Sequence, residues 1–191
     1  MHRVNFCQDD DVARKLIKEA NYIEQILEKE FLSQVGVFCA GKKRSELEIA
    51  MEGARIAQGN KSRGGKLYED IVNRAIRCVS QLPIVQGWKI PGFKHKPLDA
   101  FIQSPRILFF ITMKRSVRER LDNWNQQGPH CAKYAAQMKL EHRFFAFTHD
   151  DKVEAARGKI VDGVTVISTR NQDQIRRVLS EIRDATVFTL T

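Results

Sequence analysis

The sequence has no apolar run that approaches the roughly 18 residues needed to cross a membrane as a helix. Its first eight residues also lack the apolar core of a secretory signal, and three aspartates follow them. We therefore expect a chain that neither spans a membrane nor carries an export signal.

Paired cysteines are also missing. The four cysteines are scattered, and no two of them form a Cys-x-x-Cys pair: they are Cys7, Cys39, Cys78 and Cys131. A disulfide framework or a structural zinc site would need closer grouping. This spacing predicts a protein of the reducing cytoplasm.

Residue composition excludes a disordered chain, since 42% of the residues are hydrophobic and 29% are charged. A length of 191 residues suits one compact domain, with room for a small helical extension.

Positive charge is concentrated in one third of the chain. The formal net charge is +9, and residues 61–120 contain thirteen basic and four acidic side chains, so this segment holds the whole surplus. A concentrated surplus suits a polyanion, and nucleic acid is the first expectation because contacts to phosphates release condensed counterions. The alternative is a basic surface without a partner.

The first 82 residues show helical periodicity. Apolar spacing predicts a helix over 11–32, and Ser45 with Glu48 predicts a capping box that opens a second helix ending near Gly59. We expect a basic turn over 59–65, then a third helix over 66–82 that Pro83 stops.

The pattern then changes to short apolar runs. Strands are expected at 84–90, 98–102, 106–114, 144–148, 164–168 and 186–190, and helices at 114–127, 132–140, 151–157 and 172–184. This order predicts an α/β fold, a mixed central sheet flanked by helices with an N-terminal helical segment.

Two charged residues stand out in the predicted hairpin. Asp99 and Lys114 lie among apolar neighbours, and burying a carboxylate costs several kcal/mol unless it is paired or binds a metal. A buried ion pair between them, or exposure at strand ends, would explain both.

Glu69 favours a functional explanation. On a helical projection it lies at the edge of the buried arc of its helix, whereas Asp70 falls on the solvated side. Two carboxylates and a backbone carbonyl suit a hard cation such as Mg²⁺ that keeps several waters. With a lysine beside them, these groups could form a Mg²⁺-dependent phosphodiesterase site.

At these residues the chain resembles a known group. Pro97-Leu98-Asp99 and the strand ending Ile111-Thr112-Met113-Lys114 resemble the PD-(D/E)xK nuclease superfamily, and Gly65–Val72 resembles the helix carrying its accessory glutamate. The following Arg118-Glu119-Arg120 is similar to type II restriction endonucleases of the EcoRII and SsoII kind. The resemblance implies a restriction-endonuclease-like fold, catalysis by Asp99, Glu69 and Lys114, and Mg²⁺ held by Asp99, Glu69 and the Met113 carbonyl.

The Arg118-Glu119-Arg120 triplet also has a physical rationale, because arginine can donate two hydrogen bonds to guanine and glutamate can accept one from cytosine. The alternative is a solvated helix start. Contacts to phosphates are expected from basic and polar neighbours: Lys61, Arg63, Lys66, Arg115 and Ser116.

One position departs from the family pattern. Two residues before the lysine, where the family has an acid, this chain has Thr112, and the later helical position used by some relatives is Gln127. Either Asp99 and Glu69 suffice, or the protein binds DNA without cutting it.

The sequence as a whole predicts a cytoplasmic, Mg²⁺-dependent type II restriction endonuclease that cuts double-stranded DNA at a short GC-containing site. We expect one nuclease domain over 1–191: a helical part at 1–60, a catalytic and DNA-reading core at 61–127, and further strands and helices at 128–191. A palindromic site favours a homodimer. Alternatives are the strand-cutting subunit of a heterodimer, a non-catalytic DNA-binding protein and a structure-selective nuclease.

Overall fold

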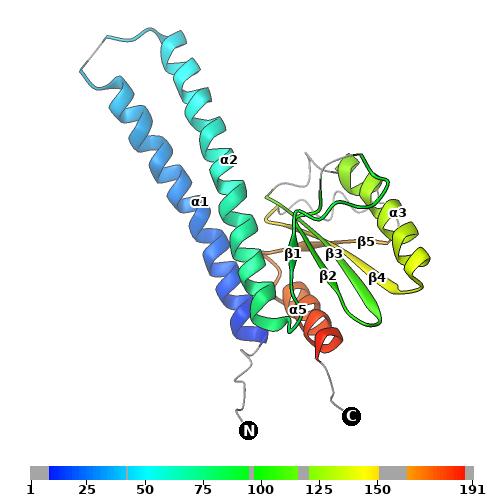
Figure 1. Ribbon diagram of the computed structural model, residues 1–191. Helices are drawn as coiled ribbons and strands as arrows, with labels where there is room; N and C mark the ends of the chain where they lie inside the picture. The colour runs from blue at the N-terminus through cyan, green and yellow to red at the C-terminus, as the bar shows by residue number, and fades with distance from the viewer. Residues whose placement is uncertain (1–8, 42, 95–96, 116–120, 151–162, 188–191) are drawn as a thin grey trace.

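The computed structural model describes residues 9–41, 43–94, 97–115, 121–150 and 163–187. Its elements are α1 (Asp9–Cys39), α2 (Glu46–Val79), β1 (Val85–Gln86), β2 (Ala100–Gln103), β3 (Ile107–Lys114), α3 (Leu121–Met138), β4 (Glu141–Thr148), β5 (Val164–Ser168) and α5 (Gln172–Thr186), as Figure 1 shows.

The five strands form one mixed sheet in the order β1-β2-β3-β4-β5. Strands β1, β2 and β3 are antiparallel neighbours, whereas β3, β4 and β5 run parallel. The sheet is flanked by helices on both faces, so the predicted α/β class with an N-terminal helical segment is confirmed.

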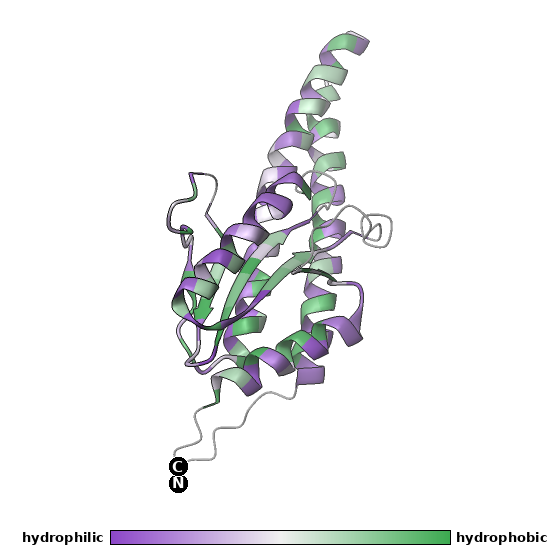
Figure 2. Ribbon diagram, turned by 90° about the vertical axis from the view of Figure 1, so that its right-hand side faces the viewer, coloured by the Kyte–Doolittle hydropathy of each residue, from purple (hydrophilic) through white to green (hydrophobic). Residues whose placement is uncertain are grey.

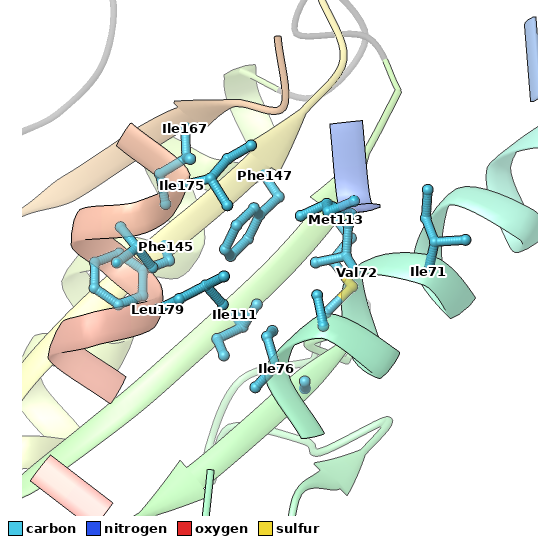
Figure 3. Close-up of a cluster of buried hydrophobic side chains, with 14 of the residues drawn as sticks. Ile71, Val72, Ile76, Ile111, Met113, Phe145, Phe147, Ile167, Ile175 and Leu179 are labelled. Carbon is cyan, nitrogen blue, oxygen red and sulfur yellow. The ribbon is translucent and has the colours of Figure 1, made fainter. Parts of the chain in front are cut away.

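Strand alternation divides the core into two layers. On one face Ile111, Met113, Phe145 and Phe147 pack against α1, α2 and α5, and Figure 3 shows side chains of α2 and α5 meeting them. On the opposite face, Leu108 and Phe110 of β3 and Phe144 of β4 share a hydrophobic cluster with Trp124 of α3. Lys114 ends β3 on this second face, which determines where the site lies.

The expected break at 59–65 is wrong, because α2 runs unbroken from Glu46 to Val79. Glycine weakens a helix by about 1 kcal/mol relative to alanine. This local cost is why Gly59, Gly64 and Gly65 predict a turn. Packing on α1 offsets it, since Ile56 and Gly64 are buried and Asn60 donates to the Leu27 carbonyl at 3.3 Å. The two helices form a hairpin that rises well beyond the sheet (Figure 2).

A second expected break, at Gly128-Pro129, is also wrong, since α3 continues through both residues. Burial of Trp124, Cys131 and Ala135 against the sheet holds the helix on both sides of the proline.

Other expected bounds differ less. The third helix ends at Val79 rather than 82, and the strand expected at 84–90 is reduced to Val85–Gln86. Thr186 ends α5 instead of opening a strand, while 188–191 and the helix expected at 151–157 lie outside the described residues.

Gly59→Ala should raise the free energy of unfolding by about 0.5–1 kcal/mol, because a Cβ there meets nothing within 4 Å and the helix loses a flexible residue. The matched control is Gly64→Ala, whose Cβ would collide with Leu27 and Arg115. Urea unfolding of both variants measures the difference; equal stabilisation by the two substitutions would contradict it.

Candidate active site

The structure brings the three candidate catalytic side chains together. Lys114 Nζ lies 2.6 Å from Glu69 Oε1, and 3.0 and 3.1 Å from the two Asp99 carboxylate oxygens. Glu69 comes from α2, Asp99 immediately precedes β2, and Lys114 is the last residue of β3. Positions as much as 45 residues apart thus meet at one end of the sheet.

Asp99 is held by the neighbouring strand. Its Oδ2 accepts hydrogen bonds from the Met113 backbone N–H at 2.6 Å and from the Thr112 hydroxyl at 2.9 Å. Thr112, at the position where the family that the sequence resembles has an acid, therefore orients the Asp99 carboxylate. No local pattern around Thr112 signals this contact, because it depends on the register in which β2 pairs with β3.

The three side chains are partly buried but open to solvent. Their exposed fractions are 16% for Asp99, 24% for Lys114 and 33% for Glu69. Such sites strengthen electrostatic interactions relative to bulk water and still admit ions and substrate.

A cavity of about 180 Å³ adjoins Asp99 and Lys114, and α3 forms its far wall. Its lining residues are Pro97, Asp99, Thr112, Lys114, Asn123, Trp124 and Gln127. Since one water occupies about 30 Å³ in the liquid, the cavity can hold several waters or a hydrated cation. Gln127, which the sequence marked as a possible but uncharged ligand position, lies in this wall.

The carboxylates of Asp99 and Glu69 are the ligand type that Mg²⁺ takes, and the predicted magnesium stays a prediction. Two carboxylates face one ammonium group, so the site has a formal charge of −1 and attracts a cation. Among the described residues, no three His, Cys, Asp or Glu side chains gather to hold a metal. Two carboxylates suit an ion that retains most of its waters, as Mg²⁺ does, rather than zinc. The part predicted for the Met113 carbonyl stays a prediction.

The expected phosphate contacts lie on a helix rather than in a turn. Lys61, Arg63 and Lys66 are exposed on α2, and Lys66 lies one helical turn before Glu69. Arg63 pairs with Glu30, whereas half-buried Arg115 lies against Gly64. The remaining predicted contacts to DNA fall outside the described residues: Ser116, Arg118, Glu119 and Arg120.

Comparisons with protein-family models, curated proteins and solved structures found no match to this chain. None of the helices in the described ranges combines the length and the apolar character that a membrane span requires.

Proposed function

We propose that this protein is a Mg²⁺-dependent type II restriction endonuclease that hydrolyses phosphodiester bonds of double-stranded DNA. The observation that carries the proposal is the convergence of Glu69, Asp99 and Lys114, with a cavity adjoining Asp99 and Lys114. The concentration of positive charge in residues 61–120 supports DNA as the substrate.

Each side chain has a distinct part in the proposed reaction. Asp99 and Glu69 would hold Mg²⁺, which polarises the scissile phosphate and lowers the pKa of a bound water when it is present. Lys114 supplies a positive charge where the transition state gains negative charge, and it can orient the attacking water. Thr112 and the Met113 amide fix Asp99 in place, so the carboxylate does not have to reorganise.

Recognition and assembly follow from the same proposal. Arg118, Glu119 and Arg120 would read G·C pairs, with Lys61, Lys66 and Arg115 positioning the backbone. A palindromic site would be cut by a twofold dimer, one active site per strand, or by a heterodimer in which this chain is the cutting subunit.

A plasmid digest tests the proposal. We expect discrete fragments with Mg²⁺ and none with EDTA, and mapping of the fragment ends would identify the recognition site. Intact plasmid together with salt-sensitive DNA binding would instead support the second candidate, a non-catalytic DNA-binding protein. One observation favours that candidate, because the Lys114 ammonium lies between the two carboxylates and could satisfy them without a metal.

Gln127→Glu should lower the Mg²⁺ concentration for half-maximal cleavage roughly tenfold, equivalent to about 1.4 kcal/mol. The substitution adds a third carboxylate to the cavity that contains Asp99 and Lys114. Metal titrations of the cleavage rate measure the effect. The control is Gln126→Glu, which adds the same charge at an exposed position of α3 and should change nothing. Equal titrations for the two variants would count against a metal in this cavity.

A further inference from the structure

A second polar cluster forms where three parallel strands end. Arg115 follows the last residue of β3, His149 follows that of β4, and Arg170 lies two residues beyond β5. In α/β sheets, ligands bind outside the carboxyl ends of the strands. Because Lys114 and Arg115 are consecutive, the cluster adjoins the candidate active site but faces the α1 side of the sheet.

One carboxylate from α1 meets all three side chains. Glu24 Oε2 lies 3.1 Å from Arg170 Nη2 and 3.7 Å from His149 Nε2, and Glu24 Oε1 lies 3.9 Å from Arg115 Nη2. The Glu24 side chain is 43% exposed. An ion pair with that much solvent contact contributes little stability, so a competing anion can displace it at low cost.

Buried groups fix the histidine ring. His149 Nδ1 and Thr169 Oγ1 are 2.9 Å apart, the Tyr68 hydroxyl donates to the same oxygen at 3.3 Å, and Thr169 donates to the Thr148 carbonyl at 3.2 Å. Burial raises the pKa of Tyr68, which therefore remains a neutral donor. This network directs His149 Nε2 toward Glu24.

The two arginines are placed by neighbouring backbone. Arg170 Nε donates to the His149 carbonyl at 3.1 Å, which orients its guanidinium. Arg115 lies against Gly64, where a Cβ would overlap its guanidinium. His149 and Arg170 are therefore held in place before any ligand arrives, which lowers the entropy lost on binding.

We propose that Arg115 and Arg170 bind a backbone phosphate of the nucleic acid beside His149, and that Glu24 occupies this position in the free protein. The proposal rests on the proposed DNA substrate and adds a positioning site beside the reacting phosphate. A phosphate suits the cluster because its oxygens can accept from several donors at once, and paired arginine N–H groups match its geometry. Glu24 then acts as an internal competitor that DNA must displace.

The test is binding of a labelled DNA duplex in EDTA, measured by fluorescence anisotropy over a range of salt concentrations. Arg170→Gln should weaken binding roughly three- to tenfold and reduce the salt dependence by about one phosphate contact. Glu24→Gln should strengthen binding by about threefold, and this gain should disappear in the double variant with Arg170→Gln.

Two controls match these variants. Arg143→Gln removes an arginine at the opposite end of β4 that is 2.6 Å from Glu181, and Glu19→Gln removes an α1 carboxylate that is 2.8 Å from Arg74. Neither should alter DNA affinity.

The outcomes separate this proposal from the proposed hydrolysis. If the protein cuts DNA but Arg170→Gln and Glu24→Gln leave its DNA affinity unchanged, the phosphate site is overturned and the proposed hydrolysis stands. If the variants bind DNA as expected but no cleavage occurs, the phosphate site is supported and the proposed nuclease activity is contradicted. If Glu24→Gln only lowers the melting temperature, the cluster anchors α1 and the proposal fails. Stabilisation by inorganic phosphate that Arg170→Gln removes, with DNA affinity unchanged, would likewise overturn it in favour of free phosphate.

Discussion

Lys114→Met should lower the rate of DNA cleavage by on the order of 10²–10³ while leaving Mg²⁺ binding intact. The ammonium group lies within 3.1 Å of both carboxylates, at the position where the proposed transition state would gain negative charge. Removing one preorganised donor of this kind lowers a rate constant by on the order of 10²–10³. Methionine preserves the length and apolar stem of the side chain, so packing at the end of β3 is kept.

Single-turnover cleavage and calorimetric Mg²⁺ titration together measure this effect. If Lys114 supplies charge to the reaction, the cleavage rate falls in the variant. Mg²⁺ still binds, because Asp99 and Glu69 have lost the ammonium group that competes with the metal. Lys133→Met, at an exposed position of α3, is the control and should leave both measurements unchanged. A Lys114→Met variant that cuts at the normal rate would show that the ion pair is structural.

The three candidate catalytic residues could be found from the sequence because each one breaks a local pattern. Asp99 and Lys114 are charged residues beside apolar runs, and Glu69 lies at the edge of a buried helical arc. Charges in such places need partners, and the short link between β2 and β3 limits which partners are within reach. The meeting of Lys114 with Asp99 follows from these constraints, whereas its contact with Glu69 depends on how α2 packs against the sheet.

Other features depend on contacts between distant segments, and periodicity does not report them. The continuity of α2 through Gly59 and Gly64 comes from packing on α1, which outweighs the local preference for a turn. The place of Gln127 in the cavity wall depends on how α3 packs against the sheet through Trp124, Cys131 and Ala135. The contact of Glu24 with Arg170 joins positions 146 residues apart, so neither residue carries a signal of its own.

Asp99→Asn should reduce cleavage by on the order of 10³ and remove measurable Mg²⁺ binding, without unfolding the protein. The carboxylate charge is needed to hold the metal, whose contribution to transition-state stabilisation is several kcal/mol. The amide oxygen of asparagine can still accept the hydrogen bond that the Met113 N–H now donates at 2.6 Å, so the strand contact persists. Cleavage assays with calorimetric metal titration measure the first effect, and urea unfolding measures the second.

Asp99→Ala separates catalysis from folding. Alanine leaves the fully buried Met113 amide without its side-chain acceptor, and an unsatisfied buried donor costs about 1–3 kcal/mol. The alanine variant should therefore be less stable than the asparagine variant, although both should be inactive and fail to bind Mg²⁺. The contrary result is an Asp99→Asn variant that cuts DNA normally and differs from the unmodified protein only in stability. Asp99 would then have a structural role at the strand ends and would not bind a metal. The comparison is decisive because the two substitutions remove the same charge and differ in the hydrogen bond they retain.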